Sequence, residues 1–168
     1  MFKWTLLSVL LLGSIISTSY ASETRILGGA GIAECRGSQT ESCSGQEFFR
    51  LGLEQVFTPQ WSADIVADAK LFTTDERFNS FGVNLKYIFS PTASAVYVKA
   101  GPHYYQRRES TGIFRSESRS GVGISTALGW QNTPMDRVGY GVEVWYRTLD
   151  DFDAYGVSVF ISAKLNIF

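Results

Sequence analysis

The sequence predicts an all-β fold, an eight-stranded antiparallel transmembrane β-barrel with short periplasmic turns and longer extracellular loops. Three observations lead to this prediction. Apolar residues alternate with polar or small ones along most of the chain after residue 25, which is the period of a half-buried strand. Short and long connections alternate along the chain between these segments, so the two ends of the structure differ. Many of the intervening residues are glycines, and small residues suit the inside of a narrow barrel.

Composition limits the class of protein. The chain has 168 residues, enough for one domain, and 45 % of them are hydrophobic although the mean hydropathy is near zero. Charged residues make up 18 %, against roughly 25 % in a typical soluble domain. A formal net charge of −1 excludes a basic nucleic-acid binder, and the apolar content excludes a disordered chain. We expect a folded domain with much apolar surface.

Residues 1–21 are predicted to be a secretory signal peptide. Lys3 supplies the positive start, residues 6–16 supply a short apolar core, and Ser19-Tyr20-Ala21 places small residues at the cleavage site. The core is too short to span a bilayer comfortably, and no later segment approaches 18 consecutive apolar residues. The mature domain is therefore expected to be residues 22–168, a barrel without a membrane helix.

Eight strands are expected in this domain. The first covers residues 25–34, which are Gly-rich and do not reveal which face points inward. The others are predicted at 49–57, 61–71, 81–89, 95–107, 121–130, 138–147 and 157–167, where apolar residues occupy every second position. Pro102 interrupts the fifth of them, which a closed ladder tolerates only at a bulge or an unpaired position.

The connections support this count. Pro59, Pro91 and Pro134 fall in the short gaps after the second, fourth and sixth strands. The other gaps are polar or charged and cover residues 35–46, 73–77, 108–118 and 150–153. Aromatic residues gather toward both ends of the strands, as in the two girdles of a membrane barrel. Beside the short turns they are Phe57, Trp61, Phe89, Trp130 and Tyr140, and toward the long loops they are Phe49, Phe72, Phe78, Tyr104, Tyr146, Phe152 and Tyr155.

Charged residues occupy the same alternate strand positions as the small residues, so they are predicted to point into the barrel. Because charges inside a barrel must pair or be hydrated, we expect them to form an interior ion-pair network. They are Arg50, Glu54, Asp64, Asp68, Lys70, Lys86, Lys99, Glu143, Arg147 and Lys164. The alternative is a soluble, lipocalin-like binding barrel in the periplasm, with the charged face toward water and the apolar face inside.

Two cysteines, Cys35 and Cys43, lie eight positions apart in a polar segment without periodicity. An even number of cysteines in an exported chain favours a disulfide that staples the loop. No histidine or second cysteine pair lies nearby, so a metal site is not expected there.

The chain resembles the small eight-stranded outer-membrane barrels of Gram-negative bacteria, the class of the OmpA transmembrane domain and of OmpX and Ail. The residues that carry the resemblance are Gly121-Val122-Gly123-Ile124-Ser125 with Leu128-Gly129-Trp130, the segment Tyr140–Arg147, and the closing strand from Tyr155. The resemblance implies a location in the bacterial outer membrane and roles in membrane integrity, adhesion or host interaction. It also implies that Phe168 is the signal for the barrel assembly machinery, although Phe168 falls in the phase of Lys164 and Asn166 rather than in the outward one.

Enzymatic and transport functions are the alternatives. Some barrels of this size modify lipid A with a His–Ser pair, but the single histidine, His103, has no serine two positions away and is expected to be a hydrogen-bonded lumen residue. An eight-stranded barrel is filled by its own side chains, so at most a narrow ion leak is expected. We predict a non-enzymatic, monomeric protein without a cofactor, whose function is structural or depends on surface contacts.

The third long loop is the candidate contact surface. Arg107, Arg108, Arg115 and Arg119 flank Glu109 and Glu117 in it. Arginines at the outer rim can bind phosphates of lipopolysaccharide through bidentate hydrogen bonds, while a solvated loop with internal ion pairs is an equally good interpretation. A host or surface ligand of the external loops is the other partner that the sequence leaves open.

Overall fold

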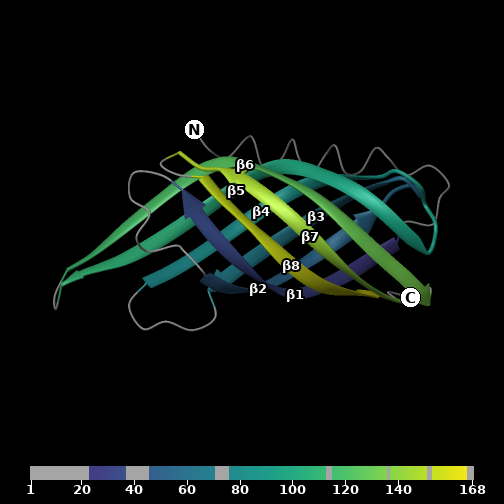
Figure 1. The fold of residues 1–168 in the computed structure, drawn as a ribbon, viewed down its shortest axis with the longest axis horizontal. Helices are drawn as coiled ribbons and strands as arrows, with labels where there is room; N and C mark the ends of the chain where they lie inside the picture. The colour runs from purple at the N-terminus through teal and green to yellow at the C-terminus, as the bar shows by residue number, and fades with distance from the viewer. Residues whose placement is uncertain are drawn as a thin grey trace.

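A computed structural model describes residues 23–36, 46–70, 76–112, 115–135, 137–150 and 153–165. They form eight antiparallel strands that close in sequence order into one barrel (Figure 1). The strands are β1 (Glu23–Arg36), β2 (Gln46–Val56), β3 (Trp61–Lys70), β4 (Glu76–Ile88), β5 (Ser94–Gly112), β6 (Arg115–Met135), β7 (Val138–Thr148) and β8 (Asp153–Lys164). The closed eight-stranded barrel confirms the predicted fold class. The predicted signal peptide, Cys43 and Phe168 lie outside the described residues.

The barrel has two different ends. The end with the connections 57–60, 89–93 and 136–137, where β1 begins and β8 ends, is called the turn end below. The opposite end is called the loop end. None of the elements in the described residues is a helix long and apolar enough to cross a membrane.

The outer face is apolar. In β7, exposed and buried residues alternate without exception from Val138 to Thr148. Large apolar side chains cover the outside, and Ile124 and Ile161 are more than 60 % exposed. The same alternation assigns the faces of β1, where Leu27 points inward and Ile26 and Ile32 point outward. The charged face is therefore inside, which overturns the alternative of a lipocalin-like barrel with its charges toward water.

Inward rings and glycines alternate around the lumen. Tyr97 lies directly opposite Gly129 on the neighbouring strand, and a Cβ added at Gly129 would lie 2.2 Å from the ring of Tyr97. The same relation holds for five further cross-strand pairs, in which the added Cβ would lie 2.6 Å or less from the ring: Phe48–Gly31, His103–Gly82, Tyr105–Gly121, Trp145–Gly156 and Phe160–Gly141. These glycines therefore leave the space that the large inward side chains fill.

Pro102 lies within β5 at a gap in one ladder. It is paired with Ile124 of β6, but the β4–β5 ladder has no pairs between Gly82–His103 and Leu85–Ala100. The gap agrees with the expected unpaired position, because proline has no N–H to donate to β4.

The β5–β6 hairpin is longer than the sequence predicts. β5 has 19 residues and β6 has 21, whereas the other strands have between 10 and 14. The ladder continues from Arg107–Arg119 to Gly112–Arg115, and both strands extend beyond the other strands at one end (Figure 1). The prediction of a loop at 108–118 is thus wrong, since most of these residues lie in β5 and β6. Its charged and hydroxyl residues do not show the apolar alternation by which the other strands were found.

Candidate functional site: the charged interior and the turn-end mouth

The inside of the barrel holds charged side chains that the strand alternation points inward. Eight of the ten predicted interior residues are buried: Arg50, Glu54, Asp64, Asp68, Lys86, Lys99, Glu143 and Arg147. They come from β2, β3, β4, β5 and β7. Four are positive and four are negative, so the buried set is neutral.

Six of them form one chain of alternating charge. Arg147 contacts Asp68, and Arg50 holds the same carboxylate with Nε 2.7 Å from Oδ1 and Nη2 3.2 Å from Oδ2. Arg50 Nη1 also lies 2.6 Å from Glu143 Oε1. Two-pronged contacts of this kind are the strong form of arginine–carboxylate pairing.

Lys99 continues this chain. Its Nζ lies 2.7 Å from Glu143 Oε2 and 3.1 Å from Asp64 Oδ2. Tyr97 donates its hydroxyl to Glu143 Oε2 at 3.0 Å, and Asn84 Nδ2 donates to Asp64 Oδ1 at 2.6 Å. Each carboxylate therefore has at least two partners, which is what charges require to remain ionised inside a protein.

Glu54 and Lys86 form a second group nearer the turn end. Lys86 Nζ lies 2.9 Å from Glu54 Oε1 and 2.6 Å from Gln131 Oε1, and Ser62 Oγ donates to the same Glu54 oxygen at 2.6 Å. A cavity of about 20 Å³ lies beside Lys86, Lys99 and Glu143. Such a cavity has room for one water molecule.

Two predicted members of the network lie at strand ends. Lys164 is at the end of β8, and its Nζ lies 2.8 Å from Glu23 Oε2 at the turn end rather than inside. Lys70, the last residue of β3, is half-buried and makes no ion pair within the described residues. The prediction was wrong for Lys164, because the alternation of a strand assigns a face but not a depth along the barrel. The place of Lys70 in the network stays a prediction.

Polar partners of the network were not singled out from the sequence. Ser62, Ser80, Asn84, Gln131 and Ser158 are all buried and donate to or accept from the charged residues. They occupy inward-facing alternate positions of their strands, and this pattern could have identified them from the sequence.

Both ends of the network are bordered by apolar side chains. Toward the loop end a cluster contains Phe48, Tyr105, Trp145, Leu149 and Ala154, together with the deeper Ala127, and is called the loop-end cluster below. The rings of Phe48 and Trp145 meet edge to face with centroids 5.7 Å apart, and Arg147 Cζ lies 4.2 Å from the centroid of the Trp145 ring. Toward the turn end, Ile88, Ala95 and Tyr97 pack together with Phe160.

His103 is buried, with 1 % of its surface exposed, beside Gly82 on the neighbouring strand. Neither ring nitrogen has a hydrogen-bond partner in the described part of the chain. The expectation of a hydrogen-bonded lumen histidine is therefore wrong. In the same residues no group of three or more His, Cys, Asp or Glu is arranged to hold a metal ion.

Glu23 marks the turn-end mouth, outside the apolar belt, whose first outward residue on β1 is Ile26. Partial burial opposes ionisation of Glu23, but hydrogen bonds and charges from Lys164 and Arg25 outweigh it and hold the pKa of this carboxyl below its usual value. The mouth therefore keeps an ionised carboxylate between two cations.

The predicted loop residues have different outcomes. Arg107, Arg108, Arg115 and Arg119 lie in the extended β5–β6 hairpin rather than in a loop. Cys35 is near the end of β1, and because Cys43 lies outside the described residues, their disulfide stays a prediction.

Solved structures share this architecture. The attachment invasion locus protein Ail of Yersinia pestis superposes with a TM-score of 0.67 at 16 % identity, over 88 % of this chain and 100 % of that one. Neisserial surface protein A gives a TM-score of 0.72 at 12 % identity, over 87 % and 100 % of the two chains. The N-terminal β-barrel domain of Pseudomonas aeruginosa OprF gives 0.68 at 7 % identity, over 84 % and 97 %. The fold is that of the small outer-membrane barrels.

No protein-family model and no curated protein matches the chain. At these low identities the solved structures establish the outer-membrane barrel fold and nothing finer. The localisation in the bacterial outer membrane agrees with this fold and with the apolar outer face, because a membrane barrel places its apolar band toward lipid.

Proposed function

We propose that this protein is an integral outer-membrane barrel that acts through its surface, by binding phosphate groups of lipopolysaccharide with the extended β5–β6 hairpin. The hairpin is the observation that carries the proposal. It places arginines directly opposite one another on neighbouring strands, Arg107 opposite Arg119 and Arg77 opposite Arg108.

Directly opposed like charges destabilise a sheet unless something neutralises them. A phosphate between two guanidinium groups does so with bidentate hydrogen bonds. Glu109 lies opposite Glu117 two positions further along the hairpin. Along β5, Arg108 falls on the same alternate positions as the exposed residues Pro102 and Tyr104. Of the four predicted arginines, it is therefore the one that shares the face of the apolar outer residues.

A filled interior supports a surface role rather than a wide pore. The neutral ion-pair chain and the loop-end cluster occupy the lumen, as expected for eight strands. One similar structure is described as Ail in complex with the heparin analogue sucrose octasulfate, which is also a polyanion. A sulfated sugar is therefore the competing ligand of the same chemistry.

The first experiment tests the membrane barrel. Cells are fractionated, and the protein is run on a gel with and without boiling, since compact barrels resist detergent until heated. Recovery in the outer membrane with a heat-dependent mobility shift is expected. Recovery in the soluble periplasm without a shift would overturn the proposal.

The second experiment tests the ligand. Binding of lipopolysaccharide by the refolded protein is compared for R107Q/R119Q, R77Q/R108Q and a control, R137Q/K164Q, which removes two positive charges at the turn end. Loss of a paired arginine contact is expected to weaken binding roughly tenfold in the first two variants only. Equal binding in all three would refute the hairpin site, and a preference for sulfated sugar over lipopolysaccharide would reassign its ligand.

Assembly, oligomeric state and chemistry stay predictions within this proposal. We expect insertion by the barrel assembly machinery, a monomer, no cofactor and no enzymatic activity. The lipid A-modifying alternative predicts a change in lipid A mass that disappears in His103→Ala, measured on membranes with and without the protein.

A further inference from the structure

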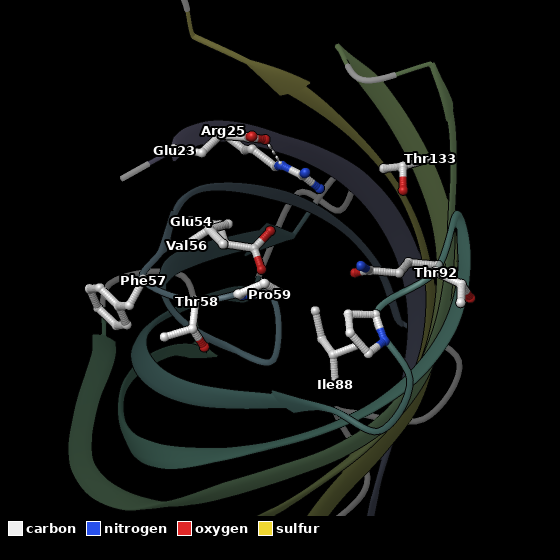
Figure 2. A pocket seen from close by; sticks show the side chains of 12 residues that line it. Glu23, Arg25, Glu54, Val56, Phe57, Thr58, Pro59, Ile88, Thr92 and Thr133 are labelled. Carbon is white, nitrogen blue, oxygen red and sulfur yellow. Dashed lines mark hydrogen bonds and ion pairs between the residues drawn. The ribbon is translucent and has the colours of Figure 1, made fainter. Parts of the chain in front are cut away.

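A pocket opens at the turn end of the barrel. It has a volume of about 310 Å³, which is at the lower limit of small-molecule sites. Figure 2 shows Arg25 and Glu54 projecting into it from β1 and β2, with Ile88 and Pro59 facing them. Arg25 and Glu54 are cross-strand neighbours, and Lys164 lies opposite Arg25 on its other side.

Arg25 has unused binding capacity. Its Nε donates to Glu23, and within the described residues its two terminal nitrogens make no hydrogen bond. The side chain is 18 % exposed, so these nitrogens are only partly hydrated. The two terminal nitrogens of a guanidinium can bind a carboxylate with two parallel hydrogen bonds.

The charges around the pocket do not balance. Arg25 is the cation that lines the pocket, beside the carboxylates Glu23 and Glu54. Both carboxylates also have partners outside the pocket lining: Lys86 pairs with Glu54 from inside the barrel, and Lys164 pairs with Glu23 from the exposed end of β8. Counted with these partners, the described group of three cations and two carboxylates keeps one positive charge, which a single negative charge on Arg25 would neutralise. Glu54 lies beside Arg25 and would repel a second negative charge on the same ligand.

The rest of the wall combines the apolar side chains of Val56, Phe57, Pro59, Ile88 and Pro91 with the polar ones of Thr58, Thr92, Gln131 and Thr133. We propose that the turn-end pocket binds a small organic monocarboxylate, with its carboxylate on the terminal nitrogens of Arg25 and its apolar body against Ile88 and Pro59. The site lies at the end of the barrel opposite to the arginines of the extended β5–β6 hairpin, so either site can fail while the other stands.

Benzoate and its neutral analogue benzamide are suitable probes. Each is titrated by NMR into the full refolded barrel in detergent micelles, with protein-free micelles as a blank. Benzoate is expected to bind saturably, and benzamide roughly tenfold or more weakly, because the charge-assisted hydrogen bonds are lost.

Three variants locate the site. Arg25→Gln is expected to weaken benzoate binding roughly tenfold, while Arg137→Gln, which removes an exposed turn-end arginine that does not line the pocket, leaves it within about twofold. Thr92→Phe keeps Arg25 but fills the pocket from its exposed rim and is expected to abolish binding.

The heat-dependent gel shift verifies that each variant is folded. Equal affinity for benzoate and benzamide, or unchanged benzoate affinity in folded Arg25→Gln or Thr92→Phe, would overturn the proposal. No saturable benzoate binding by the folded parent barrel would also overturn it.

Discussion

Tyr97 lies directly across the β5–β6 ladder from Gly129, and its ring occupies the space that a Cβ atom at position 129 would fill. Its hydroxyl meanwhile donates to Glu143 in the ion-pair chain. The glycine thus positions a ring that in turn holds a charged group, which links the packing of the barrel to its electrostatics.

Gly129→Ala should displace this ring. The added Cβ would lie 2.2 Å from Cζ of Tyr97, which is 1 % exposed and enclosed by neighbours, so we expect a loss of roughly 1–3 kcal/mol from overpacking. The urea midpoint of unfolding measures it. Gly28→Ala is the matched control, because nothing lies within 4 Å of a Cβ added there. Equal midpoints for the two variants would contradict the packing argument.

Arg50→Met should break the centre of the ion-pair chain. Asp68 would retain Arg147, and Glu143 would retain Lys99 and Tyr97, but both carboxylates would lose their contact with Arg50. Removing one partner from a buried pair typically costs about 3–5 kcal/mol. Lys164→Met, in an exposed pair, should cost no more than about 1 kcal/mol. Comparable losses in the two variants would show that the interior is hydrated like the surface.

Phe48→Ala with Trp145→Ala should open the loop end to ions. These rings close the lumen above the charged chain, and their removal is expected to raise single-channel conductance in planar bilayers. The control is Phe49→Ala with Tyr146→Ala, the adjacent residues that point outward. Unchanged conductance in the first variant would place the barrier in the ion-pair chain instead.

Acidification should remove the contribution of Glu23 to stability. Because its pKa lies below the usual 4.5 in the folded protein, the contribution is complete above that value and is lost as the pH falls through the lowered pKa. The difference in unfolding midpoint between the parent and Glu23→Gln should therefore be largest near neutral pH and shrink toward pH values well below 4.5. A difference independent of pH would mean that packing, not charge, stabilises the mouth.

The sequence predicts the barrel well because a period of two assigns every residue of a strand to a face. Arg50, Asp68 and Glu143 were placed inside on this basis, and they are buried. The partners of each charge could not be predicted, since Arg50 meets Glu143 across the lumen, 93 positions away in the chain. Such contacts depend on the stagger of the strands around the barrel, which alternation does not encode.

The ends of the strands were harder to predict. Beyond the apolar belt both faces can be polar, so residues 108–118 gave no alternation although most of them pair in the ladder. Lys70 and Lys164 share the inward phase but lie at strand ends. The turn-end pocket was missed for the same reason, because it combines residues from strand ends and turns.

The loop-end cluster also gives the barrel interior a sidedness. The rings of Phe48, Tyr105 and Trp145 border the buried charges toward the loop end, whereas the pocket lined by Glu54 opens at the turn end. We therefore expect water and protons to enter the described part of the barrel mainly from the turn end. The interior carboxylates and amines should then respond to acidity and ionic strength in the compartment at the turn end before they respond to changes at the loop end.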